Sequence, residues 1–101
     1  MLESVYEEVL HYELRKAGLN CKRQVGIPLV YDNVRFDIGF RADIIVEEKA
    51  IIELKSVEIV LPVHKKQLLT YLKITDMRLG LLINFNEELI RNGITRVVNK
   101  L

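Results

Sequence analysis

Residues 41–56, RADIIVEEKAIIELKS, constrain the fold of this chain more than any other stretch. Apolar residues flank a short polar turn, EEK at 47–49, so the segment predicts two antiparallel strands joined as a hairpin. The strands nevertheless carry Asp43, Glu53 and Lys55, and charged groups inside strands are unfavourable unless they pair or bind something. The hairpin therefore indicates both a local fold and a candidate functional site.

The register of this hairpin places the two carboxylates beside each other. With the turn near 47–49, Asp43 falls opposite residues 52–54, next to Glu53. Glu53 and Lys55 are two residues apart in one strand, so their side chains share a face. Adjacent carboxylates repel one another, and a bound divalent cation removes that cost. Oxygen ligands of this kind favour Mg²⁺ or Mn²⁺, and an ammonium on the same face can stabilise charge on a phosphate.

The rest of the chain predicts two helices and further strands from its periodicity and turn residues. Pro28 is unfavourable inside a paired strand, so its segment is expected at a sheet edge or a bend. Pro62 suits the first position of a helix, and a helix between two strands usually links a parallel pair. The expected helices are 2–19 and 61–75, and the expected extended segments are 20–32, 34–46, 50–59, 78–85 and 93–100. The fold class expected is α/β (α+β), with a mixed sheet flanked by helices.

Composition narrows the class of protein. A chain of 101 residues predicts a single domain, 1–101, with a thin core that a homodimer would supplement. The net charge of +1 excludes a strongly basic nucleic-acid binder, and the single cysteine, Cys21, excludes an internal disulfide. No apolar stretch is long enough to cross a membrane and no signal peptide is evident, so we expect a cytoplasmic protein without a membrane partner.

The motifs resemble those of a known group of proteins. Asp43 followed by Glu53-Leu54-Lys55 resembles the signature of the PD-(D/E)XK nuclease superfamily, with Ala42 in place of the proline. Gln67 and Tyr71 form a QxxxY pattern similar to that of several exonuclease branches. The opening LESVY resembles the end of the motif that names the GxxExxY family, although the glycine of that motif has no counterpart. With FRADIIV, IIELKSVE, LPVHKKQLLTYL and LGLLINFN, this resemblance covers nearly the whole chain.

The resemblance implies a restriction-endonuclease-like core and a metal-dependent nuclease that hydrolyses phosphodiester bonds in DNA. In that family pattern Asp43 and Glu53 hold the Mg²⁺ or Mn²⁺ ion, helped by the backbone carbonyl of Leu54, and Glu3 of the first helix is an extra ligand. Lys55 then positions the attacking water and stabilises the transition state.

The same resemblance implies that Gln67 and Tyr71 fix the lysine or a substrate phosphate. The alternative function is a non-catalytic, nuclease-like module that binds nucleic acid or a protein partner. A metal-free structural domain is a third interpretation.

Each candidate also has a purely structural interpretation. Glu53 and Lys55 can form a same-face salt bridge, and Asp43 can cap the turn. Glu3 is favourable at a helix N-terminus because of the helix dipole.

Five further residues are open in the same way. Gln67 and Tyr71 can be a surface polar contact and a core residue, and His64 is expected on the surface rather than as a ligand. Asp37 and Arg41 flank Asp43 and can form an ion pair.

Overall fold

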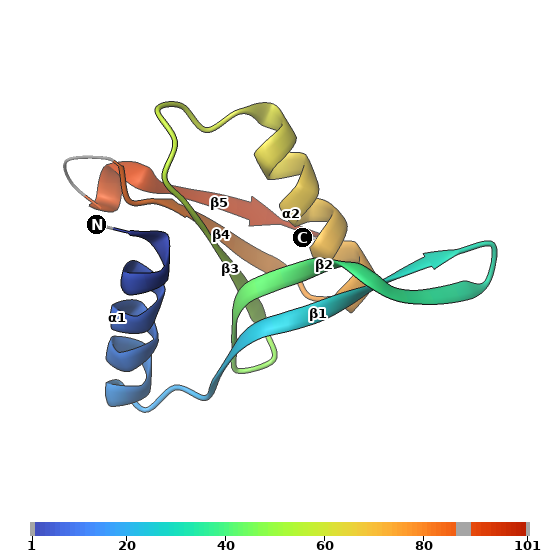
Figure 1. Ribbon diagram of the computed structural model, residues 1–101, viewed down its shortest axis with the longest axis horizontal. Helices are drawn as coiled ribbons and strands as arrows, with labels where there is room; N and C mark the ends of the chain where they lie inside the picture. Colours follow the sequence, from blue (N-terminus) through green and yellow to red (C-terminus); the bar gives the residue numbers. More distant parts are fainter. Residues whose placement is uncertain (1, 87–89, 101) are drawn as a thin grey trace.

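The computed structural model describes residues 2–86 and 90–100, which form a mixed sheet with a helix on each face (Figure 1). The sheet has five strands in the order β1-β2-β3-β4-β5; β3 and β4 run parallel and the other neighbours are antiparallel. The elements are α1 (Glu3–Lys16), β1 (Cys21–Tyr31), β2 (Val34–Val46), β3 (Ala50–Lys55), α2 (Pro62–Thr75), β4 (Leu79–Asn84), η1 (Ile90–Gly93) and β5 (Ile94–Val98).

Helix α1 covers one face of the sheet, as its three- and four-residue spacing predicts. Tyr6, Leu10 and Leu14 pack against the buried cluster of Ile44, Ile52, Leu54 and Ile83. Acidic and basic residues lie in its first and last turns respectively, where the helix dipole favours them. The backbone then turns at Gly18, whose φ of +88° favours glycine, and leads into β1.

Helix α2 covers the other face and joins the parallel strands β3 and β4, which confirms the predicted crossover. Pro62 is its first residue, and the backbone N–H of Leu61 donates to His64 Nδ1 at 3.0 Å, so the imidazole caps the helix. Leu68, Tyr71 and Leu72 are buried against the sheet. Strand β4 is the continuous apolar run expected between two layers of side chains.

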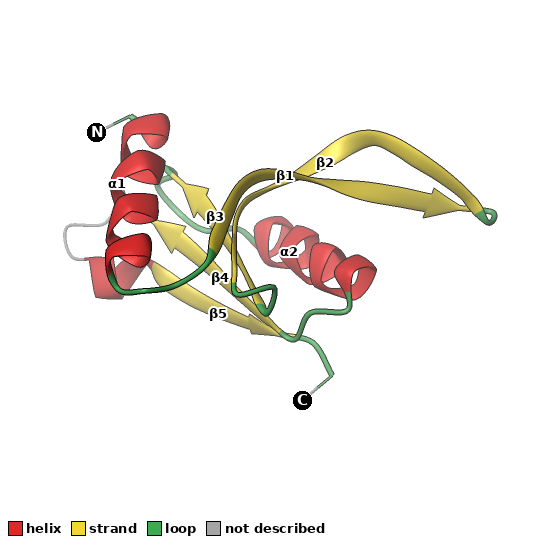
Figure 2. Cartoon of the chain, turned by 90° about the horizontal axis from the view of Figure 1, so that it is seen from below, coloured by secondary structure: helices red, strands yellow, loops and turns green. Residues whose placement is uncertain are grey.

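Strand β1 lies at the edge of the sheet, and its pairing with β2 is irregular at Pro28. The register shifts between Ile27 and Leu29, where the proline offers no backbone N–H. This confirms the predicted edge position and bend. Beyond this shift the β1–β2 hairpin continues past the end of α2 as a two-stranded extension, which is clearest in Figure 2.

The simple alternation predicted along β2 is wrong near Asp43. A regular two-residue period along 34–46 predicts that Phe36, Ile38, Phe40, Ala42 and Ile44 share one face. Instead Ala42 packs in the cluster beneath α2 and Ile44 in the cluster beneath α1. The side chain of Ile38 lies outside the described part of the chain. The alternation breaks where the backbone pairing of β2 with β3 stops, because side chains take over the hydrogen bonds at that point.

Close packing of α2 on β4 leads to a stability prediction. A Cβ on Gly80 would lie 2.8 Å from Cγ of the buried Leu68, whereas a Cβ on Gly26 would meet nothing within 4 Å. We expect Gly80→Ala to lower the free energy of unfolding by about 1–3 kcal/mol through overpacking. Gly26→Ala is the matched control and should leave it unchanged or slightly raised. Urea unfolding measures both, and equal midpoints for the two variants would contradict the packing.

Candidate functional site

Two carboxylates replace the backbone hydrogen bonds between β2 and β3. The backbone ladder of these strands ends at the pair Ile44 and Ile52. At the next position the backbone N–H of Asp43 donates to Glu53 Oε2 at 2.8 Å, and the N–H of Leu54 donates to Asp43 Oδ2 at 2.8 Å. The carboxylates therefore satisfy two backbone donors of adjacent strands, and the predicted capping of the turn by Asp43 is not what its side chain does.

The pKa values of both carboxyl groups are raised, chiefly by burial. Glu53 is 6% exposed, and its pKa is raised from 4.5 to about 8, first by burial and then by the adjacent charge of Asp43. Burial also raises the pKa of Asp43, against the opposing effect of the Leu54 N–H. A hydrogen bond between the two carboxyl groups raises the pKa of Glu53 and lowers that of Asp43. Burial therefore favours the neutral form of both groups in the absence of a cation.

Lys55 lies at the same end of β3, half-buried. Its positive charge lowers the pKa values of Glu53, Asp43 and Glu3, each against a larger effect of burial. Among the described residues no ion pair joins Lys55 to either carboxylate. The Lys55 ammonium thus lowers the pKa values of the acids by its charge, without direct contact. A Glu53–Lys55 salt bridge, the structural alternative from the sequence, is not formed.

Tyr71 contributes to the site from α2, whereas Gln67 does not contact it. The Tyr71 ring is buried against Phe40, with ring centroids 5.3 Å apart. Burial raises the pKa of the Tyr71 hydroxyl, and the charges of Glu53 and Asp43 raise it further, so the phenol lies within their field. Gln67 is exposed one turn earlier in α2, and no hydrogen bond links it to the carboxylates in the described part of the chain.

The N-terminal turn of α1 approaches the carboxylates from another side. Glu3, Ser4, Glu7, Gln24 and Asp43 line a cavity of about 350 Å³. Burial raises the pKa of Glu3, and the negative charges of Asp43 and Glu7 raise it further. Glu3 is therefore an N-terminal helix acid that also faces the carboxylate pair.

A buried carboxylate that the sequence reasoning missed fixes the position of α1. Glu7 is 7% exposed and accepts hydrogen bonds from Arg23 Nε at 3.1 Å, Arg23 Nη2 at 2.9 Å and Gln24 Nε2 at 2.6 Å. Gln24 adopts a left-handed φ of 51°, and its carbonyl accepts from Arg41 Nη1 at 2.9 Å. The signal in the sequence is the spacing of Glu3 and Glu7, one helical turn apart on the same face. We call Glu7, Arg23 and Gln24 the α1 clamp.

Comparison with known proteins identifies the fold. A sequence model of the PD-(D/E)XK nuclease superfamily matches residues 1–97. The chain belongs to this superfamily. None of the curated proteins compared with the sequence matches it.

A solved structure supports the fold assignment. The crystal structure of SSO0001 is similar with a TM-score of 0.74 at 23% sequence identity, over 98% of this chain and 51% of the SSO0001 chain. The chain thus spans about half the length of that protein. The mixed α+β sheet flanked by helices is that of the restriction-endonuclease-like fold, as the sequence predicted. Among the described residues no helix is long and apolar enough to cross a membrane.

The donor set of this PD-(D/E)XK site fits a hard divalent cation in its chemistry. Within residues 2–86 and 90–100, no group of three or more His, Cys, Asp or Glu side chains is arranged to hold a metal ion. Asp43 is nevertheless half-buried and Glu53 buried, and both have raised pKa values, so a bound cation would favour their charged forms. All donors are oxygen atoms, which suit Mg²⁺ or Mn²⁺.

Asp37 and Arg41, whose roles were open in the sequence, do not pair with each other. Arg41 Nη1 donates to the Gln24 carbonyl at 2.9 Å. Asp37 Oδ1 pairs with Arg35 Nε at 2.7 Å rather than with Arg41.

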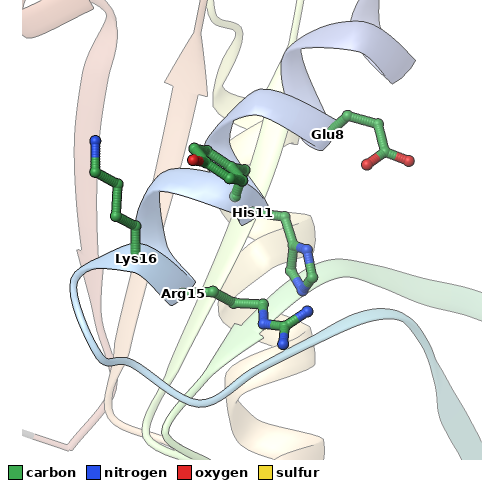
Figure 3. A pocket seen from close by; sticks show the side chains of 5 residues that line it. Glu8, His11, Arg15 and Lys16 are labelled. Carbon is green, nitrogen blue, oxygen red and sulfur yellow. The ribbon is translucent and has the colours of Figure 1, made fainter.

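The larger cavity of the PD-(D/E)XK domain, about 550 Å³, is a surface groove along α1. Glu8, His11, Arg15 and Lys16 line it together with Tyr12, and Figure 3 shows His11 and Arg15 side by side with Lys16 pointing away from them. A single helix supplies every one of these residues, and the β2–β3 carboxylates are absent from its lining. The cavity of about 350 Å³ is therefore the candidate site, because Glu3 and Asp43, whose pKa values are raised, both line it.

The raised pKa of Glu53 predicts how the free energy of unfolding depends on pH in the metal-free protein. The pKa of Glu53 is 4.5 ordinarily and about 8 in the folded chain, so the folded state binds more protons between these values. Its contribution to stability is fully present below the unfolded pKa and is lost as pH rises through the folded pKa. In EDTA the urea midpoint should fall from about pH 5.5 to about pH 8.5. Glu53→Gln should flatten this fall, whereas Glu58→Gln, at an exposed residue, should retain it. A wild-type urea midpoint that rises between about pH 5.5 and about pH 8.5 would contradict a raised pKa of Glu53.

The α1 clamp predicts an asymmetry between two adjacent glutamates. Glu7 and Glu8 both pair with Arg23, but the Glu7 side chain is 9% exposed and the Glu8 side chain 67% exposed. We expect Glu7→Ala to reduce the free energy of unfolding by about 1–3 kcal/mol, because it removes the buried acceptor of Arg23 and Gln24 while Arg23 keeps its pair with Glu8. Glu8→Ala should cost less than about 0.5 kcal/mol. Similar losses in thermal or urea unfolding would show that Glu7 is not the anchor.

Proposed function

We propose that this chain is a metal-dependent nuclease of the GxxExxY type that hydrolyses phosphodiester bonds in DNA. The observation that carries the proposal is the geometry of Asp43 and Glu53, whose carboxylates each accept a backbone N–H at 2.8 Å across β2 and β3, with Lys55 at the same end of β3. Each acid satisfies one backbone N–H group, but neutral side chains could do the same without the unfavourable burial of a negative charge. The superfamily match supports a nuclease-like domain, and cleavage of DNA is part of the proposal.

In this proposal Asp43 and Glu53 would hold one Mg²⁺ or Mn²⁺ ion. The backbone carbonyl of Leu54 and the carboxylate of Glu3 complete the oxygen ligands. When bound, such an ion supplies a Lewis acid that favours attack by water on a phosphodiester.

The remaining polar groups act on the substrate and the lysine. Lys55 orients the attacking water and stabilises the negative charge that develops on the phosphate. The Tyr71 hydroxyl, within the field of Glu53 and Asp43, holds the ammonium of Lys55 in place. Gln67, exposed on α2, is proposed to contact a phosphate of the bound strand rather than the acids.

The alternative is a nuclease-like module that binds nucleic acid or a protein partner without cleaving it. The near-neutral net charge of +1 favours this second function, because strong electrostatic binding to DNA needs an excess of cations. The retained acid pair and lysine favour catalysis. The two functions differ in their response to metal, so one set of variants separates them.

The test is cleavage of single-stranded, duplex and branched DNA in Mn²⁺ or Mg²⁺, with thermal unfolding of the same samples. We expect metal-dependent cleavage and a higher Tm in Mn²⁺, since the ion binds only the folded state. Asp43→Asn should lower cleavage at least about 100-fold and remove most of the Mn²⁺ shift. Without metal it should be as stable as the wild type, because one buried acid is removed.

Asp37→Asn is the matched control, because it makes the same substitution at an exposed acid of the same strand. It should retain both cleavage and the Mn²⁺ shift. Lys55→Ala should lose cleavage while keeping or strengthening the shift. A wild-type Tm indifferent to millimolar Mn²⁺, together with no cleavage, would leave the non-catalytic module as the function.

A further inference from the structure

A buried asparagine ends strand β4 beside Lys55. Strand β4 is apolar except at its last residue, Asn84, which is 2% exposed and lies opposite Lys55 in the parallel pairing of β3 with β4. Burying a carboxamide is unfavourable unless its donors and its acceptor find partners. The partners of Asn84 therefore indicate what this side chain does at the end of the strand.

Asn84 holds both backbone groups of Val57, two residues beyond the end of β3. The Val57 N–H donates to Asn84 Oδ1 at 3.1 Å, and Asn84 Nδ2 donates to the Val57 carbonyl at 2.7 Å. The carboxamide thus makes the two hydrogen bonds that a residue of a neighbouring strand would exchange with Val57. It extends the hold of β4 on the chain past the point where the backbone pairing with β3 ends.

The backbone of Lys55 is held from the same end of β4. The Phe85 N–H donates to the Lys55 carbonyl at 3.0 Å, and the Phe85 ring stacks on Tyr6 of α1 with ring centroids 4.8 Å apart. Phe85 is therefore anchored itself, and Asn84 anchors the chain just after Lys55. A strand end that is held in this way resists local opening, and the backbone sets the direction of the side chain that it carries.

We propose that Asn84 is a positioning residue for Lys55, because its carboxamide fixes the end of β3 and thereby the place of the ammonium relative to Asp43 and Glu53. Its hydrogen bonds go to backbone groups and not to the acids. The consequence for cleavage rests on the proposed nuclease function, whereas the placement of Lys55 does not. Misplacing a group that orients the attacking water lowers turnover and leaves ground-state binding intact.

The opposite end of β4 offers a matched control. Asn99 is 4% exposed, and its Nδ2 donates to the carbonyl of Met77, which lies just before β4. Asn84→Ala and Asn99→Ala therefore each remove one buried carboxamide that holds a connection between α2 and the sheet. If Asn84 had only a structural role, the two variants would have the same effects when compared at equal fractions folded.

Amide hydrogen exchange in EDTA tests the placement of Lys55 without any cleavage. The readout is the exchange rate of the Phe85 N–H, which binds the Lys55 carbonyl, divided by that of the Leu82 N–H in the middle of β4. This ratio corrects for changes in global stability. Asn84→Ala should raise it at least about tenfold, and Asn99→Ala should change it less than about twofold. An unchanged ratio in Asn84→Ala would overturn the proposal.

Steady-state cleavage of DNA in Mn²⁺ tests the consequence for the reaction. Asn84→Ala should lower kcat about 10- to 100-fold, while KM for DNA and Kd for Mn²⁺ change less than about twofold. Asn99→Ala should retain the wild-type kcat. Equal kcat values in the two variants, or a loss confined to KM, would overturn the proposal. A wild type that does not cleave would instead remove the nuclease function, and the exchange ratio alone would then decide whether Asn84 places Lys55.

Discussion

The hydrogen-bonded junction of Asp43 and Glu53 between β2 and β3 is the constraint on which the site depends. Two backbone donors that would otherwise continue the ladder are satisfied by carboxylate oxygens. The buried Glu53 and the half-buried Asp43 are thereby held side by side, where burial raises the pKa of both. The same junction ends the β2–β3 pairing, so β2 is free to follow β1 away from the sheet.

The two helices bring further groups to this junction from opposite faces of the sheet. On α1, the α1 clamp holds Glu7 against β1, which sets the first turn and Glu3 at the cavity. On α2, Tyr71 packs on Phe40 and lies in the field of the acids. The site is thus assembled from the rigid centre of the sheet and from two helices whose positions are fixed by packing and by one buried polar cluster. Rigid elements of this kind are what preorganised catalytic groups require.

The sequence predicted the elements well because their signals are local. Helical periodicity, the EEK turn, Pro62 and the apolar run of β4 each specify structure within a few residues. The pairing of Asp43 with Glu53 was also predictable, since a hairpin register follows from its turn. The α1 clamp was not, because it joins α1 to β1 through Glu7 and Arg23, sixteen positions apart.

Other misses have the same origin in long-range geometry. The break in alternation at Asp43 arises from hydrogen bonds made by side chains across strands, which periodicity does not encode. The extension of the outer β1–β2 hairpin past α2 depends on where α2 ends relative to β1. The exposure of Gln67 beside the buried Tyr71 depends on how α2 is rotated on the sheet.

The most direct test of the central claim is to count protons released when a cation binds the carboxylate pair. Calorimetric titration of Mn²⁺ into the protein near pH 7, in two buffers of different ionisation enthalpy, gives that number. Because the pKa of Glu53 is about 8, Glu53 retains its proton at this pH, and binding should release about one proton per ion. Binding at the same stoichiometry without proton release would contradict a cation that replaces the proton of Glu53.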